Sequence, residues 1–188
     1  MLVFLFSLSL VQQDMTNEQF QNAAYWLFSV LLRDTVPVET GCLTLEDSNR
    51  HAVAVWIPPG HELDEWEFLK SGGYAFLWKF SGWERRMRYL GFGEIVKTRR
   101  WRVMKPFKQH YFYLLALGTT EQHLDNRYSA AVVESVLKKA DEAGLPCAVE
   151  TSKQEAVTFY SRLGFETVEE FSCFGITVYM LVRNPRSY

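Results

Sequence analysis

The sequence predicts an α/β fold in which a mixed β-sheet carries helices on both faces. Residues 111–117 are continuously apolar, as expected of a central strand that is buried on both sides. Residues 126–143 have the apolar spacing of an amphipathic helix, and Gly144 and Pro146 are the residues that would end it. Two short segments, 165–171 and 176–182, predict a closing pair of strands.

The length and composition predict a single domain, 1–188, because 188 residues with 48% apolar side chains can form one sizeable core. Residues 2–11 are apolar but lack the basic flank and small-residue cleavage site of a signal peptide, and they are too few to span a bilayer. We interpret them as a first strand, with a start at Met15 as the alternative, and we expect a cytoplasmic protein. Residues 16–19 (Thr-Asn-Glu-Gln) form a capping-box pattern that opens an apolar-faced helix.

The middle of the chain combines a hairpin with a helical, aromatic segment. Residues 42–57 predict two strands, and the second stops at Pro58 because proline cannot donate a ladder hydrogen bond. Residues 62–104 predict an inserted segment of two or three helices. Their aromatic side chains indicate core packing, with the wall of a ligand pocket as the alternative.

Positive charge is concentrated in residues 79–108, which hold ten of the chain's twenty Lys and Arg residues although the whole chain has a net charge of -2. A solvated basic face on a surface helix is the simpler interpretation. Recognition of an anionic ligand or a partner protein is the alternative. The sequence has no zinc-finger spacing and no aromatic RNA-binding motif, so we predict no nucleic-acid partner.

The three cysteines, Cys42, Cys147 and Cys173, are scattered and form no CxxC motif. We therefore expect buried free thiols rather than a disulfide framework or a metal site. Residues 147–151 predict a short strand. Residues 152–155 (Ser-Lys-Gln-Glu) are a second capping-box pattern, which predicts a helix that begins with Ser152 as its cap and ends at Gly164.

From about residue 52 to 185, the order of elements resembles the Gcn5-related N-acetyltransferases, the GNAT family, and looks most similar to fungal small-molecule acetyltransferases. The most specific matches are Leu117-Gly118, residues 145–152, Phe159-Tyr160, Leu163-Gly164-Phe165 and Tyr179-Met180. The resemblance implies a sheet whose central strands splay apart, with residues 62–104 as an insertion on the substrate side.

In this family the pantetheine arm of acyl-CoA lies between the splayed strands, and a Gln/Arg-x-x-Gly-x-Gly/Ala turn binds the pyrophosphate at a helix N-terminus. The cofactor-binding residues that the resemblance implies are Leu117, Gly118, Thr119, Arg127, Tyr128, Ser129 and Ala130.

The aligned turn, 124–129, departs from the family pattern, and Ala156 replaces an Asn that helps to orient the cofactor. Leu124 stands in the Gln/Arg position, and Arg127 replaces the first glycine. Asp125 would accept the helix N–H groups that a phosphate needs, whereas a guanidinium at Arg127 could pair with phosphate. The use of CoA therefore stays open at the level of the sequence.

Two catalytic roles of the family transfer by position. Tyr160 matches the tyrosine that protonates the departing thiolate, with an aromatic packed inside a short helix as the alternative. Glu150, beside the splay, could act as the base for an amine, directly or through water, with an ordinary ion pair as the alternative. His110 and His123 have no metal-ligand spacing, and Ser129 has no nucleophile-elbow context.

The resemblance implies an acyltransferase that moves an acetyl or other acyl group from acetyl-CoA or another acyl-CoA to an amine of a partly hydrophobic small molecule. We expect no metal and no membrane contact, and a homodimer is left open. Two alternatives keep the fold. One is an enzyme of secondary metabolism that does not use CoA and catalyses a cyclisation or decarboxylation. The other is a non-catalytic pseudoenzyme that docks a partner through residues 79–108.

Overall fold

The computed structural model describes residues 43–46, 51–61, 83–108, 110–119 and 127–186, together with Thr16 and Glu18. Within these ranges the strands are β1 (Leu43–Glu46), β2 (Ala52–Ile57), β3 (Phe112–Thr119), β4 (Cys147–Thr151), β5 (Glu166–Cys173) and β6 (Ile176–Arg183). The helices are α5 (Trp83–Met104), α6 (Arg127–Ala143) and α7 (Gln154–Arg162), and a 3-10 turn, η4 (Lys105–Phe107), follows α5.

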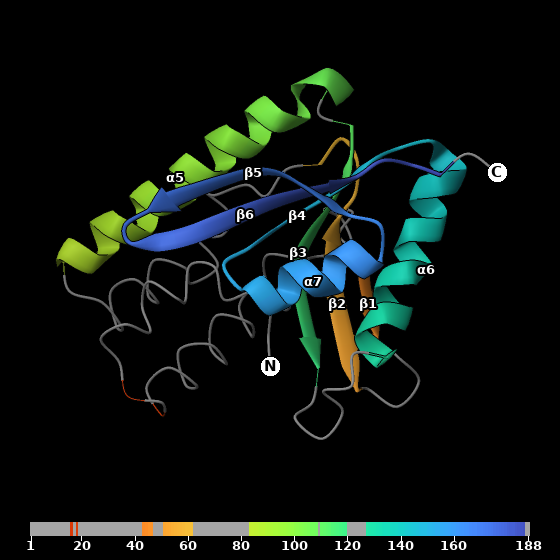
Figure 1. The fold of residues 1–188 in the computed structure, drawn as a ribbon, viewed down its shortest axis with the longest axis horizontal. Helices are drawn as coiled ribbons and strands as arrows, with labels where there is room; N and C mark the ends of the chain where they lie inside the picture. The colour runs from red at the N-terminus through yellow and green to blue at the C-terminus, as the bar shows by residue number, and fades with distance from the viewer. Residues whose placement is uncertain are drawn as a thin grey trace.

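The strands form one mixed sheet in the order β1-β2-β3-β4-β6-β5, in which only β3 and β4 are parallel neighbours. Helix α5 lies along β5 and β6 on one face, and α6 and α7 cover the other face (Figure 1). Val149 and Leu181 pack toward α6 and α7, whereas their neighbours Ala148 and Val182 pack toward Met104 of α5. The predicted α/β sheet with helices on both faces is confirmed.

The two central strands separate soon after they pair. Strands β3 and β4 share only the Cα pairs Phe112–Cys147 and Tyr113–Ala148. Beyond these pairs β3 continues along β2 to Thr119, and β4 continues along β6 to Thr151. The splay that the family resemblance implied is therefore present, and it begins after Tyr113.

A β-bulge lies at the start of the splay. Val55 of β2 pairs with Ala116, but the next residue, Trp56, pairs with Leu114, so Leu115 is an additional residue on β3. Leu115 and Ala116 consequently pack on the same face of the sheet, while Leu114 and Leu117 pack on the α6 and α7 face. A bulge bends its strand and re-aims its side chains, which fits the divergence of β3 from β4.

Most predicted elements lie where the sequence patterns place them, but the second capping box is wrong. The N-cap residue of α7 is Lys153, and its side chain makes no cap hydrogen bond. The Lys153 N–H instead donates to Thr151 Oγ1 at 3.2 Å. Lys153 is thereby held in an extended conformation, so the helix starts at Gln154 and Glu155 falls one position too early for a capping box. The predicted first strand and first helix, residues 2–31, and the insertion before Trp83 lie outside the described residues.

Both predicted glycine stops are confirmed, since Gly144 and Gly164 follow α6 and α7 with φ angles of +66° and +92°. We expect Gly164→Ala to lower the free energy of unfolding by about 1–3 kcal/mol, because an L-residue is strained at this φ. An alanine Cβ there would also lie 2.8 Å from Arg186 Nη2, whereas one at Gly144 has nothing within 4 Å. Urea denaturation of Gly164→Ala and Gly144→Ala tests this. A loss of stability in Gly164→Ala that is equal to or smaller than the loss in Gly144→Ala would contradict it.

Candidate active site

The C-terminal end of β3 and the start of α6 lie together at the open end of the splay. Leu117 and Gly118 are buried there, on a part of β3 that pairs with β2 but no longer with β4. Helix α6 packs on both β2 and β3, which places its first turn beside this strand end. The residues expected to bind a cofactor are therefore brought to one end of the sheet.

The first turn of α6 carries the other expected cofactor residues. Arg127 is exposed, Ser129 is buried, and Tyr128 and Ala130 are half-buried. The Tyr128 ring lies 4.6 Å from the ring of His51, centroid to centroid. The sequence patterns gave no reason to select His51. Residues 120–126, including His123, Leu124 and Asp125, lie outside the described residues.

Tyr160 of α7 is fully buried in the core between the sheet and α6, with the rings of Phe159 and Phe165 at 5.1 and 5.6 Å. Its hydroxyl has no hydrogen-bond partner among the described residues, and the same holds for Trp56 Nε1 in the same core cluster. Burial raises the pKa of Tyr160, so the phenol stays protonated at neutral pH. Buried donors without acceptors are costly, and these two remain available to a bound polar group.

Glu150 lies on the opposite face of the sheet, on the part of β4 that has left β3. Its Oε1 is 3.0 Å from Nη1 of Arg100, which reaches it from α5. The guanidinium of Arg100 also lies 4.0 Å from the centroid of the Tyr113 ring. Burial raises the pKa of Tyr113; Arg100 opposes the shift, and a hydrogen bond to Glu150 adds to it. The ion pair between Glu150 and Arg100 thus belongs to a cluster inside the fold and is not an ordinary surface pair.

The splay connects the two groups that the sequence selected for catalysis. Tyr160 packs in the same cluster as Val149, and successive residues of a strand point to opposite faces, so Glu150 points toward α5. Tyr113 is the last β3 residue paired to β4. Tyr160 and Glu150 therefore lie on opposite faces of the sheet in which β3 and β4 diverge.

The sequence reasoning missed Arg100 and Tyr113. A signal for Arg100 was present, because Phe92, Val96 and Val103 define the inward face of α5 and residue 100 falls on the same side at helical spacing. Nothing in the sequence indicated that Tyr113 would stand at the branch point, since it is one of several aromatics in an apolar run.

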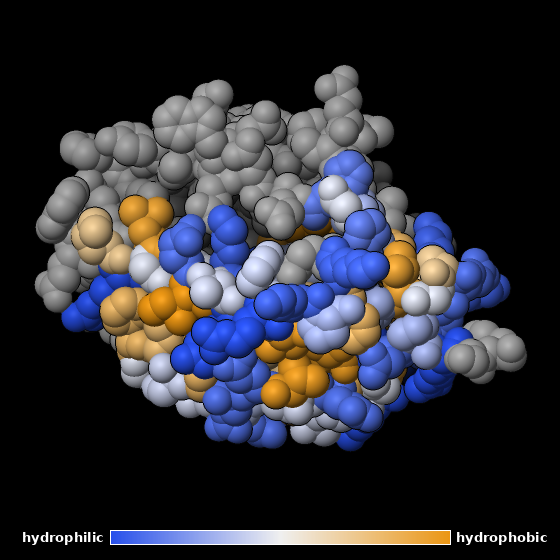
Figure 2. Space-filling model, turned by 90° about the horizontal axis from the view of Figure 1, so that it is seen from above, coloured by the Kyte–Doolittle hydropathy of each residue, from blue (hydrophilic) through white to orange (hydrophobic). Residues whose placement is uncertain are grey.

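The basic segment is only partly a solvated face. Arg99 forms an ion pair with Glu169, and its guanidinium lies 4.2 Å from the Phe171 ring centroid. With Arg100 it points toward the sheet, whereas the outer face of α5 mixes basic residues with exposed Met87, Leu90 and Trp101. Seen from above, with α5 on the near side, hydrophilic and hydrophobic residues alternate on the surface (Figure 2).

Other candidate groups do not join the site. Burial raises the pKa of Cys147 to about 12 and also raises that of Cys173, so both buried thiols are protonated and unreactive. His110 is exposed, with Nδ1 3.1 Å from the Lys108 carbonyl oxygen. The described ranges contain no cluster of three His, Cys, Asp or Glu side chains that could hold a metal ion. The helices within those ranges are too short or too polar to pass through a lipid bilayer.

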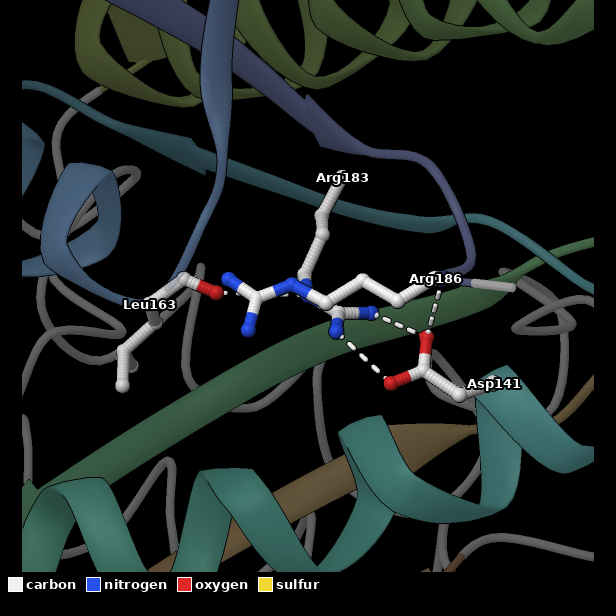
Figure 3. Close-up of polar contacts among 4 residues, drawn as sticks. All are labelled: Asp141, Leu163, Arg183 and Arg186. Atoms are coloured by element: carbon white, nitrogen blue, oxygen red, sulfur yellow. Dashed lines mark hydrogen bonds and ion pairs between the residues drawn. The ribbon is translucent and has the colours of Figure 1, made fainter. Parts of the chain in front are cut away.

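A buried ion pair holds the frame around the site. Arg183, the last residue of β6, donates to both Asp141 carboxylate oxygens at 2.7 Å, and its Nε donates to the Leu163 carbonyl at the end of α7 (Figure 3). The Arg186 backbone N–H donates to Asp141 Oδ1 at 2.8 Å. This Asp141 clamp joins the C-terminal ends of α6, α7 and β6, and thereby fixes α7, which carries Tyr160.

Comparisons with known proteins agree with this geometry, although no known family profile matches the chain. The chain is 27% identical over 124 residues to the uncharacterized N-acetyltransferase C550.08 of Schizosaccharomyces pombe. The aligned residues cover 65% of this chain and 50% of that protein. The chain thus spans about half the length of this curated relative.

Solved structures show the same fold. Drosophila melanogaster polyamine N-acetyltransferase, which catalyses the formation of N-acetylagmatine, is 17% identical, with a TM-score of 0.53 over 80% of this chain and 77% of that one. An N-acetyltransferase from Staphylococcus aureus is 10% identical, with a TM-score of 0.50 over 96% and 90%. With its splayed central strands, the chain has the fold of the Gcn5-related N-acetyltransferases, and its sequence is similar to that of an N-acetyltransferase.

Proposed function

We propose that this protein transfers an acetyl or other acyl group from acyl-CoA to an amine of a small molecule. The observation that carries the proposal is the splay. The Tyr160 hydroxyl, which has no hydrogen-bond partner in the described part of the chain, lies on one face and the Glu150 carboxylate on the other. The N-acetyltransferase name of the yeast relative supports the same reaction class. The cyclisation and pseudoenzyme alternatives gain no comparable support.

The residues of the splay fit the parts that this reaction needs. Acyl-CoA supplies a thioester, whose carbonyl carbon forms a bond to the amine nitrogen as its bond to sulfur breaks. Glu150 accepts a proton from the amine, directly or through water, and Tyr160 donates its phenolic proton to the sulfur. The edge of β3 beyond Tyr113 does not pair with β4, and backbone N–H groups at such an edge can polarise the carbonyl oxygen.

The two faces of the sheet give the two substrates separate approaches. Tyr160 and the first turn of α6 lie on one face, which suits the coenzyme, and α5 lies over Glu150 on the other. We infer that the acceptor amine approaches from the α5 face. This assigns α5, the described part of the predicted insertion 62–104, to the acceptor side within a single domain.

Binding of acetyl-CoA tests the proposal directly. A ligand at one hundred times its Kd stabilises the folded protein by about 2.7 kcal/mol, so acetyl-CoA is expected to raise Tm in a thermal shift experiment. Arg127 is exposed at the start of α6, where a guanidinium can pair with phosphate. We expect Arg127→Glu to weaken acetyl-CoA binding by about 10- to 100-fold, since charge-assisted hydrogen bonds contribute about 1.5–3 kcal/mol.

The matched control is Lys138→Glu. It makes the same charge change on the same helix, on an exposed residue about 16 Å farther along the axis. Its affinity for acetyl-CoA should stay within about threefold of the original, because exposed charges at that distance are largely screened. Equal losses in the two variants would refute a specific role for Arg127. A Tm that does not change at millimolar acetyl-CoA would overturn the proposed function itself.

A further inference from the structure

A cluster of three side chains, Arg100, Glu150 and Tyr113, lies at the branch point of the splay on the α5 face. Of the two charged side chains, that of Glu150 is 5% exposed and that of Arg100 is 20% exposed. Glu150 is held by Arg100 and by the Tyr113 hydroxyl. Arg100 is therefore the more accessible member of the ion pair.

Arg100 has more N–H donors than its ion pair with Glu150 uses. A guanidinium carries five N–H donors in a planar fork, and among the described residues Arg100 makes one hydrogen bond, from Nη1 to Glu150. Its Cζ lies over the Tyr113 ring, 4.0 Å from the ring centroid, and the N–H groups of a guanidinium point outward along the edge of its plane. Such an oriented edge can bind a second carboxylate by two parallel hydrogen bonds.

We propose that Arg100 is a specificity-determining anion anchor, and that the acceptor is an amine that also bears a carboxylate, such as an amino acid. This inference rests on the proposed function, because it places the acceptor on the α5 face. A carboxylate on the acceptor pairs with the N–H edge of Arg100 that does not bond Glu150, and it leaves the amine near Glu150. An acceptor with a second positive charge is disfavoured, because Arg100 repels that charge and the nearby carboxylate of Glu150 is already paired.

The test uses pairs of amines that differ only by a carboxylate: phenylalanine with 2-phenylethylamine, and arginine with agmatine. Acetyl transfer from acetyl-CoA is measured as kcat/KM for each member, and the ratio within a pair cancels any common loss of catalysis. The wild-type ratio is expected to favour the carboxylate member by about 10- to 100-fold. Arg100→Met should bring the ratio near one, and Arg100→Lys should retain part of it, since lysine keeps the charge but not the fork. A wild-type preference for agmatine or 2-phenylethylamine would overturn the proposal.

A binding measurement separates this inference from the proposed function and guards against a variant that fails to fold. Calorimetry measures the affinities for N-acetylphenylalanine and N-acetyl-2-phenylethylamine in the wild type and in the double variant Arg100→Met/Glu150→Gln. The double variant removes both charges of the ion pair, so it leaves no buried carboxylate without its cation. Tighter binding of the acid by the wild type alone supports the anchor, even if no amine is acetylated and the proposed function falls. Equal affinities in the wild type would overturn the anchor, whether or not acyl transfer occurs.

Discussion

Replacement of Tyr160 by phenylalanine is expected to lower kcat for acyl transfer by about 10²- to 10⁴-fold, the usual contribution of a general acid. The free energy of unfolding is expected to fall by less than about 1 kcal/mol, or to rise. The reason is that the Tyr160 hydroxyl is fully buried without a hydrogen-bond partner among the described residues, so its removal leaves no new unsatisfied group. The measurements are steady-state kinetics of thiol release from acetyl-CoA and urea denaturation of the same preparation.

Tyr179 provides the matched control. It is half-buried on β6 and packs against the same core cluster, but it has no role in the proposed proton transfer. Tyr179→Phe should therefore leave kcat within about threefold of the original, as expected for a change that removes no transition-state contact. If Tyr160→Phe keeps full activity, then Tyr160 is only a packing aromatic and the acid must be another group.

Replacement of Asp141 by alanine is expected to lower the free energy of unfolding by about 3–5 kcal/mol, which is typical when one partner of a buried ion pair is removed. Asp141 and Arg183 side chains are only 3% and 4% exposed, so the variant leaves a buried guanidinium without its carboxylate. It also removes the acceptor of the Arg186 N–H. Urea or thermal unfolding measures the loss. Glu134→Ala on the exposed face of the same helix should change stability by less than about 0.5 kcal/mol.

The same pair predicts how stability depends on pH. The hydrogen bonds from Arg183 lower the pKa of Asp141, against the opposing effect of burial. The pair therefore stabilises the fold fully above the ordinary aspartate pKa of about 3.9, and this contribution is lost as the pH falls through the lowered value. Asp141→Ala should accordingly lose less stability than the wild type between pH 5 and pH 3. If the two proteins lose the same stability between pH 5 and pH 3, then Asp141 contributes nothing to the pH dependence.

Local patterns in the sequence predicted the secondary structure well, because each pattern reflects a nearby physical cause. The glycines at 144 and 164 end their helices by adopting positive φ, and the short strand predicted at 147–151 is found at the same residues. The capping box at Ser152 failed because a competing hydrogen bond from Lys153 to Thr151 delays the helix by one residue. That competition depends on where β4 ends, which the local pattern does not contain.

The candidate site was predictable only in part. Motif resemblance selected Tyr160 and Glu150, but it did not show that they stand on opposite faces of the sheet. It also could not show that Glu150 is paired to Arg100, a residue 50 positions earlier in the chain. Contacts of that separation depend on how α5 packs across the sheet.

The sequence alone determined the order of the described elements, because that order follows from periodicity and from helix stops. Through short motifs it indicated a family resemblance and two candidate catalytic positions, Glu150 and Tyr160. Only the tertiary structure decided the bulge at Leu115, the point of divergence after Tyr113 and the burial of Glu150 under Arg100. The physical reason is that strand register and the pairing of buried charges are set by packing between distant segments. A carboxylate becomes buried and paired only when a separate element brings a cation to it.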